Sequence, residues 1–72
     1  MLMFLELFFR LNCQNEDGQT ALHLACTHGC VMRVKALLDA GCDVTLTDNS
    51  WQTPLHLASA QGHVMVMGML LR

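Results

Sequence analysis

The chain has 72 residues, of which 53% are hydrophobic and 14% are charged, and its formal net charge is −2 at pH 7. This composition is typical of one small folded domain and excludes a disordered chain, which would combine low hydrophobicity with high net charge. The four basic residues do not cluster, so neither a nucleic acid nor an anionic membrane surface is an expected partner.

The chain begins with the apolar segment MLMFLELFFRL (1–11). It is shorter than the roughly twenty residues that a membrane span needs, and Glu6 interrupts it. It also lacks the basic start and small-residue cleavage site of a signal peptide. We expect residues 1–14 to form an apolar helical segment, which is a cap, an interaction helix or the remnant of a preceding repeat. Insertion of this segment at a membrane surface is a weaker alternative.

The rest of the chain contains one unit written twice. Residues 19–39 align with residues 52–72 without a gap, and 11 of the 21 aligned pairs are identical. Self-similarity at a fixed period of 20–50 residues is the mark of a repeat architecture. The offset of 33 residues therefore predicts two stacked copies of one structural unit.

Each unit is predicted to begin with a short helix. Thr20 and Thr53 are N-cap residues, whose hydroxyl can accept the backbone N–H of the third helical residue. Pro54 falls at the first helical position, where its missing N–H costs nothing. Gly29 and Gly62 end these helices, because glycine adopts the left-handed conformation without a steric penalty.

A second helix is predicted to follow each glycine. In the first copy its apolar stripe consists of Val31, Val34, Leu37 and Leu38, and Gly41 supplies its C-cap. In the second copy Gly68 lies inside the helix, where it costs up to about 1 kcal/mol relative to alanine. Between the two units, residues 42–52 are predicted to form an extended loop and turn.

These motifs resemble the ankyrin repeat. The residues that carry the resemblance are TPLHLA (53–58), GH (62–63), LL (37–38), Gly41 and DV (43–44), at a period of 33 residues. The resemblance implies an all-α solenoid of helix-turn-helix repeats joined by hairpin-like loops. Repeat 1 spans residues 15–47, and repeat 2 spans residues 48–72 and ends after its second helix. The resemblance also implies that His23 and His56 form hydrogen bonds within and between repeats.

A cluster of histidines and cysteines requires a separate explanation. His23, Cys26, His28 and Cys30 together have the ligand types of a tetrahedral zinc site. However, the second copy has Ser59, Gln61 and His63 in place of the last three, and positions 23 and 28 point about 140° apart on a helix. Zinc binding therefore remains a remote alternative, and we expect no cofactor.

Catalysis is not expected either. A cysteine, a histidine and a carboxylate such as Asp43 or Asp48 are present, but no recognised nucleophile, phosphate-loop or metalloprotease motif occurs in the sequence. Because there is no secretory signal, we expect the cysteines to be free thiols in a reducing compartment, the cytoplasm or the nucleus.

The ankyrin resemblance implies a non-catalytic protein-interaction module, which uses its hairpin tips and first helices to contact a protein partner. No small-molecule substrate is expected. Trp51 is either an exposed contact or folded back over its own hairpin. The main alternative function is a capping or spacer fragment that stacks on adjacent repeats of a longer array, with no ligand of its own. Transferred by position, the candidate contacts are Glu16, Asp17, Gln19, Thr27, His28, Asn49, Ser50, Trp51, Gln52, Ala60 and Gln61.

Overall fold

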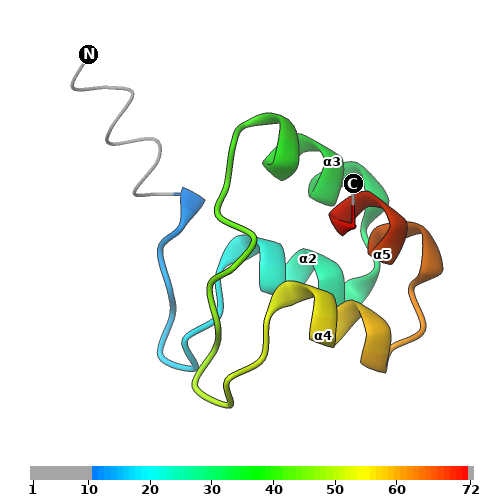
Figure 1. Cartoon of the computed structure of the whole chain (residues 1–72). Helices are drawn as coiled ribbons and strands as arrows, with labels where there is room; N and C mark the ends of the chain where they lie inside the picture. The colour runs from blue at the N-terminus through cyan, green and yellow to red at the C-terminus, as the bar shows by residue number, and fades with distance from the viewer. Residues whose placement is uncertain (1–10, 72) are drawn as a thin grey trace.

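The computed structural model describes residues 11–71 of the chain. Over that range the chain forms four α-helices and no β-strand, which confirms the predicted all-α fold (Figure 1). The larger part of the segment predicted as residues 1–14 lies outside the described residues. The helices are α2 (Ala21–His28), α3 (Val31–Asp39), α4 (Pro54–Ala60) and α5 (Val64–Leu70).

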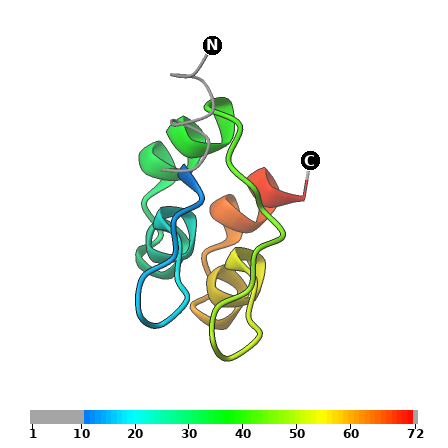
Figure 2. The same cartoon turned by 90° about the vertical axis from the view of Figure 1, so that its left-hand side faces the viewer.

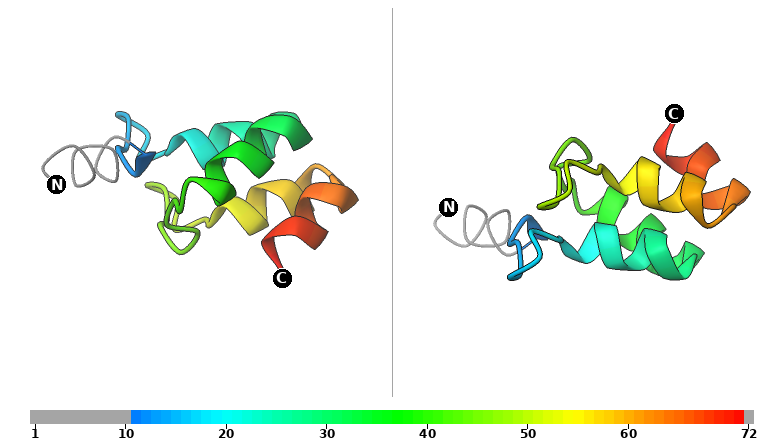
Figure 3. Two further views of the ribbon diagram at one scale, coloured as in Figure 1. Left: turned by 90° about the horizontal axis from the view of Figure 1, so that it is seen from above. Right: turned by 90° about the horizontal axis from the view of Figure 1, so that it is seen from below.

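The helices form two layers. The first helices of the two repeats, α2 and α4, run side by side in one layer, and the second helices, α3 and α5, form the other (Figures 1 and 3). The loops that precede α2 and α4 project from the same side of the molecule, and their tips lie next to each other (Figure 2). Each helix packs against its partner within the repeat and against its counterpart in the other repeat.

The first helices begin as the sequence predicts. The Thr20 hydroxyl accepts a hydrogen bond from the backbone N–H of His23 at 3.3 Å, while Nδ1 of His23 accepts from the backbone N–H of Thr20 at 3.1 Å. Thr53 and His56 make the same pair of hydrogen bonds in the second repeat. This is a capping box in which histidine takes the place of the usual glutamate or glutamine.

Glycines follow the ends of α2, α3 and α4 in a common way. Gly29, Gly41 and Gly62 have φ values of 70°, 85° and 72°, in the left-handed region. After each glycine the next backbone N–H bonds back to a carbonyl of the last turn, as in Cys42 to Leu37 at 3.2 Å. Gly41 is not the C-cap residue itself, because Ala40 takes that position and Gly41 follows it.

The core lies between the two layers. Its buried apolar side chains come from all four helices, and the predicted stripe of α3 faces it through Val34. Helix α5 continues through Gly68, so this glycine weakens the helix without ending it. The fully buried apolar members of the core are Leu22, Ala25, Cys26, Val34, Ala58 and Val66.

Candidate protein-binding surface

Each hairpin tip is held by one polar side chain. Oδ1 of Asp48 accepts hydrogen bonds from the backbone N–H groups of Ser50 at 2.8 Å and Gln52 at 2.9 Å. Asn15 holds the first tip in the same way, through the N–H groups of Asp17 and Gln19. Such side-chain bonds to the backbone two residues ahead give each loop one defined conformation.

The two tips are also bonded to each other. Asn49 donates its backbone N–H to the carbonyl of Asp17 at 3.0 Å and its side-chain amide to the carbonyl of Glu16 at 2.8 Å. Further along, the Gln14 amide donates to the carbonyl of Thr47 at 2.8 Å. Gly18 is packed so closely that a Cβ atom there would lie 2.5 Å from Oδ1 of Asn49. The tips therefore form one continuous edge.

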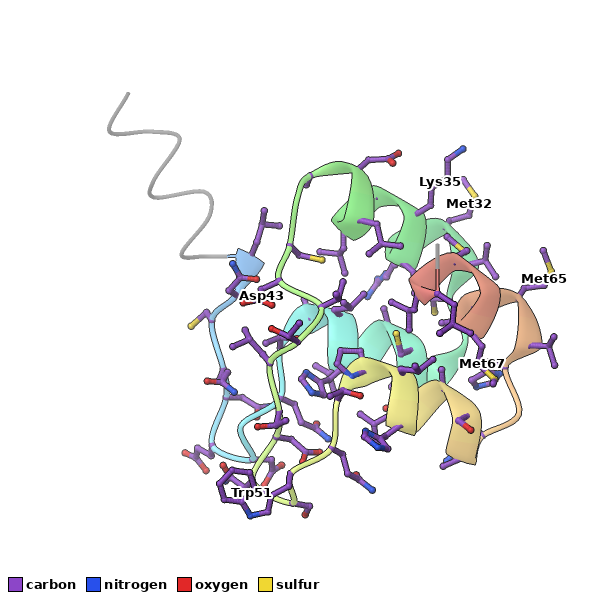
Figure 4. The ribbon with its side chains drawn as sticks, viewed as in Figure 1. Met32, Lys35, Asp43, Trp51, Met65 and Met67 are labelled. Atoms are coloured by element: carbon purple, nitrogen blue, oxygen red, sulfur yellow. The ribbon has the colours of Figure 1, made fainter. Side chains whose placement is uncertain are left out.

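Trp51 stands at the outer end of the second tip, on the opposite side of the molecule from Met32 and Met65 (Figure 4). Its side chain is 82% exposed, so the alternative in which it folds back over its own hairpin is wrong. Its φ of 63° is left-handed, and the matching residue of the first tip is Gly18, with φ 75°. The left-handed conformation costs a bulky residue about 1–3 kcal/mol, and the exposed indole makes few packing contacts that would offset this cost.

Two histidine side chains form hydrogen bonds across the interface between the repeats. Because Nδ1 of His23 accepts from Thr20, Nε2 carries the proton of the neutral ring and donates to the carbonyl of Gln52 at 2.9 Å. Nε2 of His63 donates to the carbonyl of Thr27 at 3.0 Å. This role of His63 was not predicted from the sequence, although the glycine–histidine pair at residues 62–63 marked the position.

The candidate contact residues separate into two groups. Those before the first helices lie together along the edge of tips, whereas those at the C-terminal ends of α2 and α4 lie at the opposite end of these helices (Figure 3). Gln19 and Thr27 are partly buried, and the others are exposed. In the second group, the Thr27 hydroxyl and Nδ1 of His28 both donate to carbonyls of their own helix, at 2.8 Å each.

The cysteines and histidines of the cluster are not gathered around one point in the described part of the chain. Both ring nitrogens of His23 are engaged in hydrogen bonds, and Cys26 is fully buried. Burial raises the pKa of the Cys26 thiol to about 11, with a further contribution from Cys42, so the thiolate form that nucleophilic attack requires is disfavoured. Within residues 11–71, no three histidine, cysteine, aspartate or glutamate side chains are grouped to hold a metal ion.

The fold and the hydrogen-bonded edge of tips define an α-helical repeat stack. A family model described as ankyrin repeats, with three copies, matches residues 2–72. The chain belongs to the ankyrin-repeat family. The match begins before the two repeats that the sequence predicted, and it includes most of the apolar first segment. No helix among residues 11–71 is both long and apolar enough to cross a membrane.

Similar stretches occur in proteins of different kinds. The chain is 48% identical over 60 residues to NF-kappa-B inhibitor alpha of Sus scrofa, an alignment that covers 83% of this chain and 19% of that protein. It is 43% identical over 58 residues to the Neurogenic locus Notch protein of Drosophila melanogaster, covering 81% of this chain and 2% of the relative. The E3 ubiquitin-protein ligase KEG of Arabidopsis thaliana is 40% identical over 63 residues, covering 86% of this chain and 4% of that protein. The chain thus spans a fifth or less of the length of these relatives.

Proposed function

We propose that this chain is a protein-binding module that contacts its partner through the edge of hairpin tips and the exposed surface of the first helices, α2 and α4. Ankyrin repeats are in general protein-interaction modules rather than catalysts, and the family membership supports that broad function. The observation that carries the proposal for this chain is Trp51. It combines a costly backbone conformation with an indole that is 82% exposed, and neither feature stabilises the fold.

The tips suit binding because they are already ordered. A loop whose backbone is fixed before binding loses little backbone conformational entropy on association, and tryptophan is enriched among the residues that dominate interface energies. The hydrogen bonds of Asp48 and Asn49 fix the turn on which Trp51 stands. The four cysteines are free thiols, which supports an intracellular, reducing location for the module, in the cytoplasm or the nucleus.

Selection of phage-displayed random peptides on the immobilised 72-residue chain tests the proposal. We expect the selected peptides to lose binding to the Trp51→Gly variant, in which the turn keeps its backbone because Gly18 has the same conformation in the first tip. Met32→Ala is the matched control, since Met32 is 80% exposed but lies on α3. Peptides that bind both variants equally well, or a failure to select any peptide, would contradict binding at the tips.

The spacer function is the second candidate, and one observation favours it. His23 and His56 have the same local sequence and the same capping box, yet Nε2 of His23 bonds the next repeat, whereas His56 is exposed. A further repeat stacked on α4 could supply the carbonyl that His56 lacks among residues 11–71. A spacer would gain stability when a repeat is fused after residue 72, in thermal melts of both proteins, and would select no peptide in either form.

A further inference from the structure

We propose that Trp51 on the second tip and the carboxylates of Glu16 and Asp17 on the adjoining first tip recognise an arginine side chain in a basic segment of the partner protein. This inference rests on the proposed function and adds the chemistry of the partner to it. The face of an indole attracts a cation within about 6 Å of the ring centre, and a planar guanidinium can stack on it. The exposure of Trp51 leaves its ring accessible to such a group.

The electrostatic surroundings of Trp51 favour a cation. Glu16 and Asp17 are exposed on the first tip, which Asn49 joins to the second tip through two hydrogen bonds. Their carboxylates make no hydrogen bond or ion pair within residues 11–71, since only their backbone groups are used. They therefore remain available to a ligand. Asp48 adds a third negative charge beneath the turn, fixed by two backbone N–H groups.

Positive charge lies elsewhere in the described part of the chain. Arg33 and Lys35 are both on α3, which lies in the layer of second helices, away from the tips (Figure 1). No basic side chain of residues 11–71 therefore competes for the ring of Trp51 or for the carboxylates of Glu16 and Asp17. This separation of charge would attract a basic segment to the tips and repel an acidic one.

Arginine fits the edge better than lysine does. Its guanidinium can stack flat on the indole while its N–H groups point outward in the ring plane toward carboxylate oxygens, whereas an ammonium group is a compact, strongly hydrated charge. Because the hydrogen bonds from Asn49 hold the two tips together and those to Asp48 fix the second turn, Trp51 and the carboxylates of the first tip are presented on one edge.

Tryptophan fluorescence tests the inference directly, because Trp51 is the only tryptophan and the chain has no tyrosine. The probes are a capped peptide of alternating arginine and glycine, its citrulline analogue of the same shape without charge, and its lysine analogue. We expect saturable quenching by the arginine peptide, at least threefold weaker binding of the lysine peptide, and no saturation with citrulline. Raising the salt concentration should weaken the binding of the arginine peptide, because salt screens interactions between exposed charges.

The charge requirement has its own matched variants. The double variant Glu16→Gln with Asp17→Asn should lower the affinity for the arginine peptide about tenfold. Asp39→Asn, which removes an exposed charge at the end of α3, should change that affinity less than twofold. Equal binding of arginine and citrulline peptides, or no effect of the tip variant, overturns the inference. If the phage selection yields peptides that need Trp51 but contain no enriched basic residue, the inference fails while the proposed function stands.

Discussion

The contact between Gly29 and His63 gives the sharpest test of how the two repeats are joined. A Cβ atom at Gly29 would lie 2.7 Å from Cε1 and Nδ1 of the His63 ring, closer than real Cβ contacts occur. At Gly62, the matching glycine of the second repeat, nothing lies within 4 Å of the same position. Their φ values of 70° and 72° are almost equal. Substitution by alanine therefore causes the same backbone strain at both positions, and only Gly29→Ala disturbs the repeat interface.

The expected magnitudes follow from these two contributions. A left-handed conformation costs a residue with a Cβ atom about 1–2 kcal/mol, so Gly62→Ala should lower the free energy of unfolding by that amount. Gly29→Ala also displaces the His63 ring and breaks its hydrogen bond to Thr27, which is worth about 0.5–1.5 kcal/mol. We expect Gly29→Ala to be the more destabilising substitution by about 1 kcal/mol.

Urea denaturation followed by far-UV circular dichroism measures both variants. His63→Ala serves as the second arm of a double-mutant cycle. Once the ring is absent, the cost of Gly29→Ala should fall to that of Gly62→Ala. If the two glycine substitutions cost the same while His63 is present, the argument that the ring constrains Gly29 is refuted.

Three further predictions concern stability. Gly68→Ala should raise the free energy of unfolding by up to about 1 kcal/mol in the same denaturation assay, because Gly68 lies inside α5 and nothing is within 4 Å of its Cβ position; a loss of stability would contradict this. His23→Ala should cost about 2–4 kcal/mol because it empties a fully buried site and removes one of the two hydrogen bonds that the Gln52 carbonyl accepts, the other coming from the backbone N–H of Asp48. His56→Ala should cost about 1 kcal/mol or less, and equal losses would refute the distinction. Hydrogen bonds from the hydroxyl and backbone N–H of Thr45 lower the pKa of Asp43, so the stability they provide is present above the ordinary aspartate pKa and is lost as the pH falls through the lowered value. Thr45→Val should therefore be slightly less stable than the unmodified chain at neutral pH, by less than about 0.5 kcal/mol because the carboxylate is solvated. The difference should disappear in an acid titration once the pH has fallen through the lowered pKa of Asp43.

The features that could be predicted from the sequence are those fixed by neighbouring residues. A threonine three residues before a histidine marks the start of each first helix through the capping box, and the glycine that follows the helix marks its end. The period of 33 residues then places the second copy in the same conformation. These local rules account for the bounds of α2 and α4 to within a residue or two.

The contacts between repeats could not be obtained in this way. His23 and His56 have identical neighbours on both sides in the sequence, yet one is fully buried and the other is exposed, because burial depends on which surface stacks against the helix. The approach of His63 to Gly29 likewise joins residues 34 positions apart and requires the packing of α2 against α4. The exposure of Trp51 remained open for the same reason, since a turn sequence does not specify what lies over it.

The comparison of Gly18 with Trp51 also bears on the choice between the two candidate functions. Gly18 must lack a side chain because the backbone N and Oδ1 of Asn49, from the next tip, lie 2.8 Å and 2.5 Å from its Cβ position. The same contact cannot form at Trp51, which carries a large side chain at the equivalent place. A further repeat stacked on the second one would therefore need a different arrangement at its tip, whereas a bound partner could use the indole as it stands. The presence of tryptophan at position 51, where the first tip has Gly18, thus favours a binding edge at Trp51 over a uniform continuation of the stack.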